Sequence, residues 1–185
     1  WGSRRQVLVG NTEFHRDMYS ILSLEESGRM LISSQYRELN AALHATSPEY
    51  GTSGRKWAAK VYRLAKQYEA TSVLDYGSGK GTLWKSLQSV VPEPFCVFAE
   101  YDPAIEGKDA PPSRADFVVV GDVMEHIEPD CLDAVLDDLH NLVRKAILLI
   151  VATQPAMKTL ADGRNAHLIV EPAEWWFPKL AARWR

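Results

Sequence analysis

The chain has 185 residues and a formal net charge of -3, with 46% hydrophobic residues, 24% charged residues and two cysteines. This size suits one domain with a substantial core. The balanced charge gives no support for a surface that binds nucleic-acid phosphates, although a local basic patch could still serve a nucleic-acid partner. Isolated cysteines argue against a disulfide framework, and no run approaches the roughly 20 apolar residues of a membrane span, so we expect a cytoplasmic protein outside the membrane.

Residues 4 to about 50 are expected to be helical. Apolar side chains recur at helical spacing on two successive faces, formed by Phe14, Met18, Ile21 and Leu22 and then by Tyr36, Leu39 and Leu43. We interpret residues 1–54 as an N-terminal helical cap and residues 55–185 as the main domain, with the two forming one compact unit. A cluster of helix-breaking residues at 47–54 predicts a loop between the cap and the next helix.

A strand, a glycine-rich loop and a helix are expected next. Residues 54–69 form an amphipathic helical stripe, residues 72–76 have the composition of a strand, and helical spacing resumes after residue 81. The glycines between them are spaced G-x-G-x-G, which fits neither the dinucleotide fingerprint nor a P-loop, so a nicotinamide oxidoreductase is disfavoured. Glycines let the backbone approach a ligand, and the free N–H groups of the following helix favour an electron-rich partner.

This loop and the acid before it have the pattern D-x-G-x-G-x-G, from residue 75 to residue 81. The pattern resembles motif I of class I S-adenosylmethionine-dependent methyltransferases. The resemblance implies that the loop passes under the methionine part of the cofactor and that the acid helps to hold its amino group. The cofactor-binding residues implied in this segment are Asp75, Tyr76, Gly77, Ser78 and Gly79. An ordinary glycine-rich turn without a ligand is the alternative.

Residues 95–103 are an apolar run that ends in acids, which predicts a second parallel strand. In doubly wound sheets, ligands bind beyond the carboxyl ends of the strands. The resembling family uses an acid at the end of this strand to accept hydrogen bonds from ribose hydroxyls. We assign that role first to Asp102 and second to Glu100, and a solvated loop acid is the alternative.

The remaining pattern predicts an abbreviated sheet. Residues 104–115 are too few for the helix and third strand that the family usually has at this place. Residues 116–120 and 145–152 are strand-like apolar runs, and residues 129–143 between them have one apolar helical face. The predicted fold class is therefore α/β, with a doubly wound, mostly parallel, Rossmann-like sheet that lacks the usual third strand.

The tail is less regular. Residues 153–165 are polar and predict a loop, and residues 167–170 are a short strand candidate. Pro172 can open a last helix, whose Trp175 and Trp176 we expect to pack on the sheet.

Residues 116–127 resemble the D-x-(apolar)-x-x-D-V-L-E-H pattern of the methyltransferase group that includes the ubiquinone-pathway O-methyltransferases. With the glycine loop and the second-strand acid in the right order, the resemblance covers roughly residues 50–152. It implies S-adenosylmethionine as the cofactor, with Asp122 and Val123 near its adenine or methionine part. In this family the segment before the glycine loop commonly covers the cofactor, so the loop at 47–54 is either a lid that brings His44 and Tyr50 to the ligand or an ordinary loop.

Methyl transfer needs a base only if the acceptor enters protonated. His126, at the carboxyl end of the fourth strand, and His167 are the candidate catalytic residues, and Asn165 could orient the acceptor; a structural hydrogen bond is the alternative role for His126. Asp122, Glu125 and His126 also have a D-x-x-E-H spacing that can ligate one divalent cation, as E-x-x-E-H does in some of the resembling O-methyltransferases. A metal-free loop is the alternative.

The sequence thus predicts an S-adenosylmethionine-dependent methyltransferase that modifies an O or N nucleophile, with a small molecule as the favoured acceptor. We expect a monomer or a homodimer. The alternatives are a non-catalytic methyltransferase-like binding or scaffold module and a methyltransferase that acts on nucleic acid. Cofactor binding separates the scaffold module from the enzymes.

Overall fold

The computed structural model describes residues 5–11, 30–91 and 95–184. These residues contain one five-stranded sheet with the strand order β1-β5-β4-β2-β3. Its strands are β1 (Arg5–Asn11), β2 (Ser72–Tyr76), β3 (Val97–Tyr101), β4 (Ala115–Gly121) and β5 (Val143–Ala152). The four strands β2 to β5 are parallel, and β1 runs antiparallel to β5 at one edge.

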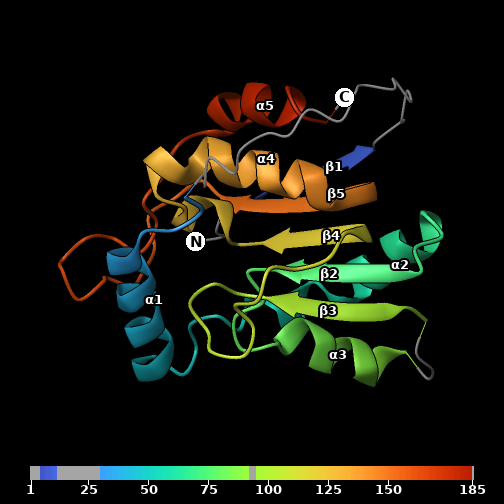
Figure 1. Ribbon diagram of the computed structural model, residues 1–185, viewed down its shortest axis with the longest axis horizontal. Coiled ribbons are helices and arrows are strands. Elements are labelled where there is room, and N and C mark those ends of the chain that lie inside the picture. The colour runs from blue at the N-terminus through green and yellow to red at the C-terminus, as the bar shows by residue number, and fades with distance from the viewer. Residues whose placement is uncertain (1–4, 12–29, 92–94, 185) are drawn as a thin grey trace, which may run out of the picture.

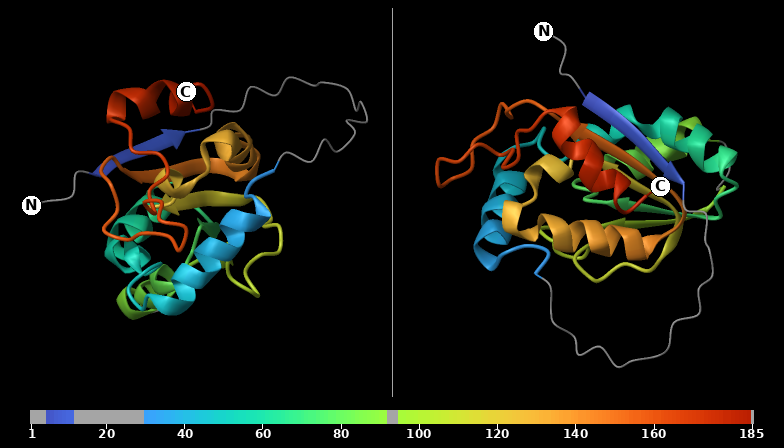
Figure 2. Two further views of the ribbon diagram at one scale, coloured as in Figure 1. Left: turned by 90° about the vertical axis from the view of Figure 1, so that its left-hand side faces the viewer. Right: turned by 90° about the horizontal axis from the view of Figure 1, so that it is seen from above.

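Helices cover both faces of the sheet. α4 (Leu132–Leu142) and α5 (Ala173–Ala181) pack on one face, and α2 (Ala58–Gln67) and α3 (Thr82–Val90) pack on the other (Figures 1 and 2). Burial on both faces explains why the central strands are continuous apolar runs, as is usual for parallel strands. The expected doubly wound α/β class is confirmed. No helix in the described parts of the chain has the length and apolarity needed to cross a bilayer.

α1 (Ser34–Thr46) lies across the carboxyl ends of β2, β3 and β4 (Figure 1). The hydroxyl of Ser33 caps this helix by accepting a hydrogen bond from the backbone N–H of Tyr36, at 3.1 Å. The backbone N–H and hydroxyl of Ser33 both donate to the carboxylate of Glu128, at 2.7 Å each. The start of α1 is therefore fixed to the loop that follows β4, and the helix covers the sheet edge where ligands bind in this architecture.

Three short 3₁₀ segments complete the connections next to this edge of the sheet. They are η1 (Ser53–Lys56), η2 (Met124–His126) and η3 (Pro129–Cys131). η1 precedes α2, and η2 and η3 join β4 to α4, so the chain turns tightly at the carboxyl ends of the strands.

The prediction of helix from residue 4 to about 50 is wrong at its start. Residues 5–11 form β1, which pairs with β5 over seven residues. Val7, Leu8 and Val9 form a short apolar and largely β-branched run there, which the assignment to a helical cap overlooked. The predicted face formed by Phe14, Met18, Ile21 and Leu22 lies outside the described residues.

The abbreviated sheet is confirmed: the described residues between β3 and β4 contain no strand, so β3 is an edge of the sheet. The strand predicted at 167–170 is wrong. The backbone N–H of His167 donates to the side-chain oxygen of Asn165 at 2.9 Å, and that of Ile169 donates to the backbone carbonyl of Glu125 at 3.0 Å. These bonds hold the segment against η2 instead of in a sheet ladder.

Candidate functional site

A cavity of about 680 Å³ lies between α1 and the carboxyl ends of the parallel strands. Its wall includes the glycine loop after β2, the loops after β3 and β4, and part of the loop at 154–158. This volume lies within the range of about 300–1,000 Å³ that is typical of small-molecule sites. The cavity is therefore large enough for a cofactor together with a small partner.

The glycine loop is closely packed by two other segments. Gly77 and Gly79 have φ angles of +76° and +52°, in the left-handed region that favours glycine. A Cβ atom on Gly77 would overlap the side chain of Val123, and one on Gly79 would lie 2.5 Å from the carbonyl oxygen of Gly51. The loop needs glycine at both positions for its backbone angle and for these close approaches.

The backbone donors of this loop are used within the protein. The N–H groups of residues 77 and 78 donate to the carbonyl of Tyr101, at 2.8 and 2.9 Å. The N–H of Gly79 donates to a carboxylate oxygen of Asp102, at 2.9 Å, and the N–H of Lys80 donates to the carbonyl of Gly51, at 2.8 Å. A phosphate cradle needs such donors to point at the ligand. The loop geometry thus agrees with the spacing of the glycines in disfavouring a dinucleotide.

Asp75 and Tyr76 end β2 beside the loop and line the cavity. Burial, together with the nearby carboxylate of Glu100, raises the pKa of Asp75 to about 7, and the ammonium of Lys108 opposes this rise. A cationic group that enters the cavity next to Asp75 would stabilise the ionised carboxylate. Asp75 is thus placed to bind an ammonium group at neutral pH.

The two acids predicted for the ribose lie in different environments. Asp102 lines the cavity, and its carboxylate accepts hydrogen bonds from the backbone N–H groups of Gly79 and Ala104, at 2.9 and 3.0 Å. Glu100 is not among the residues that line the cavity and forms an ion pair with Lys108 at 3.1 Å. A carboxylate has about four acceptor positions, so Asp102 retains capacity for a ligand hydroxyl.

The loop at 47–54 lies directly on the glycine loop. The side-chain ammonium of Lys80 donates to the carbonyls of Ser47 and Pro48, at 2.7 and 2.9 Å. The hydroxyl of Thr82 donates to the carbonyl of Thr52 at 2.9 Å. These bonds place the loop, which we call the lid loop (residues 47–54), over one side of the cavity. A lid was one of the two interpretations of this segment, and an ordinary loop was the other.

We expect Lys80→Met to loosen this loop. The change removes two charge-assisted hydrogen bonds that are partly exposed, so we expect a loss of about 1–2 kcal/mol in the free energy of unfolding. For a chain of this length, that corresponds to a fall of about 3–6 °C in the midpoint of thermal unfolding. Lys85→Met, at an exposed position of α3, is the control. Equal midpoints for the two variants would contradict the role of Lys80.

Aromatic side chains join the lid loop to the far end of the cavity. The ring of Tyr50 lies 4.6 Å from that of His44 and 5.7 Å from that of His126. The ring of His126 lies in turn 4.7 Å from that of His167. All four side chains belong to residues that line the cavity, so they form one continuous wall along it.

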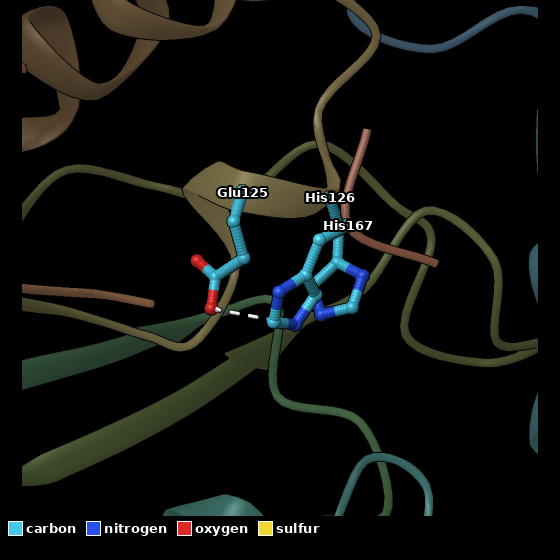
Figure 3. Close-up of side chains that lie close together, drawn as sticks. All are labelled: Glu125, His126 and His167. Atoms are coloured by element: carbon cyan, nitrogen blue, oxygen red, sulfur yellow. Dashed lines mark ion pairs between the residues drawn. The ribbon is translucent and has the colours of Figure 1, made fainter. Parts of the chain in front are cut away.

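His126 and His167 meet Glu125 at the end of this wall (Figure 3). The Nδ1 atoms of both histidines lie within hydrogen-bond distance of backbone carbonyls, at 2.7 Å from that of Ala166 and at 2.5 Å from that of Gln154. With Nδ1–H as the donor, each ring keeps its Nε2 lone pair. Glu125 is fully buried, and one of its carboxylate oxygens lies 4.0 Å from Nε2 of His167.

The donor atoms of these three residues all lie within 4.8 Å of one another, so the group could hold one cation after a small adjustment of the side chains. Two imidazoles and a carboxylate are ligands that zinc and other first-row metal ions accept. Burial and the neighbouring His167 lower the pKa of His126 to about 3, so its ring is neutral at pH 7, which is the form that ligates. Asp122 lines the cavity but is not part of this group of three.

The sequence was compared with family models, with curated proteins and with solved structures. A family model described as "Methyltransferase domain" matches residues 49–184. The chain belongs to the class I methyltransferase family. This match spans the glycine loop, the acids of β2 and β3, and the three residues Glu125, His126 and His167. No curated protein and no solved structure gave a significant match.

Membership of this family implies that the methyltransferase uses S-adenosylmethionine as its methyl donor. The cavity is lined by most of the predicted site residues, namely His44, Tyr50, Asp75, Tyr76, Gly77, Ser78, Gly79, Asp102, Asp122, Val123, His126 and His167. Asn165 does not line it. The amide of Asn165 accepts hydrogen bonds from the backbone N–H groups of Ala156 and His167 and donates to the carbonyl of Ala156, so it shapes the loop.

The sequence analysis missed polar residues of α1 that line the cavity. Tyr36 and Asn40 are such residues, and they share a face of the helix with His44. The spacing of the three residues at i, i+4 and i+8 could have indicated that they share one face of the helix. Tyr36 was instead assigned to an apolar helical face, because its ring was counted as core.

Proposed function

We propose that the methyltransferase transfers the methyl group of S-adenosylmethionine to an O or N nucleophile of a small molecule. The observation that carries this proposal is one cavity that is lined both by the glycine loop with Asp75 and by His126 with His167. A donor held by the loop would direct its methyl group along the aromatic wall toward the two histidines. The volume of about 680 Å³ favours a small acceptor over a macromolecule.

In this proposal the residues at the glycine-loop end bind the cofactor. Asp75 holds the amino group, the backbone at residues 76–79 contacts the methionine part, and Asp102 accepts a ribose hydroxyl. Asp122 and Val123 lie next to the loop and close the cofactor side. Glu100 supports the loop from outside the cavity through its ion pair with Lys108.

Methyl transfer from a sulfonium is an in-line displacement, so the enzyme mainly has to align donor and acceptor and to exclude water. We propose that Tyr50 and His44, on the lid side, restrict the acceptor while His126 and His167 face its nucleophilic atom. A pKa of about 3 makes His126 a weak proton acceptor. We therefore also propose that Glu125, His126 and His167 hold a divalent cation, which would supply Lewis acidity that makes an acceptor hydroxyl easier to deprotonate.

The test of the cofactor proposal is a calorimetric titration with S-adenosylmethionine between pH 5.5 and 8.5. Because the free carboxyl of Asp75 has a pKa of about 7 and its ionised form binds the ammonium group, each complex formed below pH 7 releases a proton. We expect the affinity to rise about tenfold per pH unit as the pH increases toward 7, and to level off above it.

Asp75→Asn is the matched variant, since it keeps the shape and removes the titration. We expect it to bind more weakly at pH 8 and to lose the rise in affinity with pH. No binding of S-adenosylmethionine by the unaltered chain would refute the enzyme and favour the scaffold alternative. Binding that does not change with pH would refute the role of Asp75 while leaving the cofactor in place.

A further inference from the structure

Three polar residues on one face of α1 form a ladder along the cavity. Tyr36, Asn40 and His44, which we call the α1 ladder, follow at one-turn intervals, and all three residues line the cavity. Four residues of helix advance by about 6 Å, so the ladder extends over about 12 Å of the cavity wall.

The ladder is short of hydrogen-bond partners. The hydroxyl of Tyr36, the side-chain oxygen of Asn40 and Nδ1 of His44 are shielded from solvent and have no hydrogen-bond partner among the described residues. Each such buried polar atom costs about 1–3 kcal/mol. Native interiors pair nearly all such groups, so three of them on residues that line one cavity indicate side chains that turn toward a bound ligand to complete their hydrogen bonds.

The two ends of the ladder face different halves of the cavity. A Cβ atom on Gly51 would overlap the ring of His44, and Gly51 touches Gly79, so His44 marks the cofactor end. Tyr36 packs in a small core with Ala166, whose carbonyl holds His126. Tyr36 therefore marks the acceptor end.

The charges around Tyr36 are already engaged. Glu128 and Arg164 are the charged side chains that act most strongly on its hydroxyl. Glu128 accepts two hydrogen bonds from Ser33, and Arg164 forms an ion pair with Asp162 at 2.7 Å. A charged ligand group would therefore find no free partner charge beside Tyr36. Burying a charge without a partner costs far more than burying a hydrogen-bonded uncharged group, so these surroundings favour an uncharged ligand.

We propose that Tyr36 and Asn40 recognise the acceptor by hydrogen-bonding an uncharged hydroxyl, carbonyl or amide group. This inference rests on the proposed function, since it names the class of acceptor for the same site. Tyr36 and Asn40 are then specificity-determining residues for the acceptor, and they leave the cofactor to the glycine loop.

The test uses three small probes of nearly equal shape: acetamide, which is uncharged, acetate and acetamidinium. Each is titrated into the isotope-labelled chain saturated with S-adenosylhomocysteine, and the nuclear magnetic resonance signals of the Asn40 side-chain amide are followed. We expect acetamide to shift these signals most strongly and saturably. Tyr36→Phe should weaken acetamide binding about threefold or more, the size of one hydrogen bond.

Two control measurements separate recognition from structure. Tyr62→Phe removes a hydroxyl from α2, at a residue that does not line the cavity, and should leave acetamide binding unchanged. Tyr36→Phe should keep the affinity for S-adenosylhomocysteine within about twofold and should not lower the midpoint of thermal unfolding, because it removes a polar atom without a partner. A clear fall in that midpoint would overturn the inference in favour of a structural hydroxyl.

Stronger shifts with acetate or acetamidinium than with acetamide would overturn the preference for an uncharged group. Unshifted Asn40 signals with all three probes would overturn the recognition site itself. If the unaltered chain does not bind S-adenosylhomocysteine, the proposed function fails. The probe titrations can then be repeated on the ligand-free chain, so the two failures are distinguishable.

Discussion

Replacing Gly79 by alanine is expected to lower the affinity for S-adenosylmethionine by about 100-fold. A non-glycine residue at a φ of +52° costs about 1–2 kcal/mol. The new Cβ would also lie 2.5 Å from the carbonyl oxygen of Gly51, a backbone atom that moves only with the lid loop. Displacing that loop removes the hydrogen bond from the N–H of Lys80 to Gly51, and together these costs approach the 2.7 kcal/mol of a 100-fold change.

Gly163→Ala provides the matched control for this prediction. Gly163 has a φ of +89°, but a Cβ placed there would meet nothing within 4 Å. This variant carries the backbone strain alone, in the loop beyond Ala156. We expect it to lose some stability to thermal unfolding and to keep its affinity for the cofactor in calorimetric titration. Equal affinities for Gly79→Ala and Gly163→Ala would show that the contact between the lid loop and the glycine loop is unimportant for binding.

The glycine loop could be predicted because its chemistry is local. Residues 75–81 contain the acid, the turn and the glycines that allow close backbone approach, all in one short segment. The α/β class could be predicted as well, because apolar strand-like runs and helical faces alternate from residue 54 to residue 152. β1 was missed because its apolar run is short and because the strand gains its stability from pairing with β5, about 140 residues later. A window of local sequence contains no information on that partner.

The part of the cavity near His126 and His167 depends on contacts between distant segments. His167 was recognised as a candidate, but its place beside Glu125 follows from the hydrogen bond between Ile169 and the backbone of Glu125, a tertiary contact. Asn165 does not line the cavity, because its amide serves its own loop. Acids and amides in polar loops have many local hydrogen-bond partners. The sequence therefore indicates which side chains could bind or ionise, and the fold decides which of them reach the cavity.

Glu125, His126 and His167 are expected to bind one divalent cation per chain, with Zn²⁺ or Mn²⁺ as the probe. The carboxylate oxygen of Glu125 and Nε2 of His167 are 4.0 Å apart, within twice a metal–ligand bond of about 2.1 Å. Both imidazoles have Nδ1 within hydrogen-bond distance of a backbone carbonyl, which leaves Nε2 as the free ligand atom of each ring. The buried carboxylate of Glu125, which accepts a hydrogen bond from the backbone N–H of Ala152, would gain further from a cation, because a charge held away from water is costly.

His167→Gln should lower the cation affinity by more than about 100-fold, since changing even an outer partner of a metal ligand costs about 10- to 100-fold. Calorimetric titration of the chain with Zn²⁺ in the absence of cofactor measures this directly, without relying on methyl transfer. His140→Gln is the control, because His140 is an exposed histidine of α4 that does not line the cavity. Similar affinities for the two variants would place any bound cation elsewhere. In that case the buried carboxylate of Glu125 would have to be explained by its hydrogen bond from the backbone N–H of Ala152 and its neighbour His167, and the acceptor would be deprotonated without a metal.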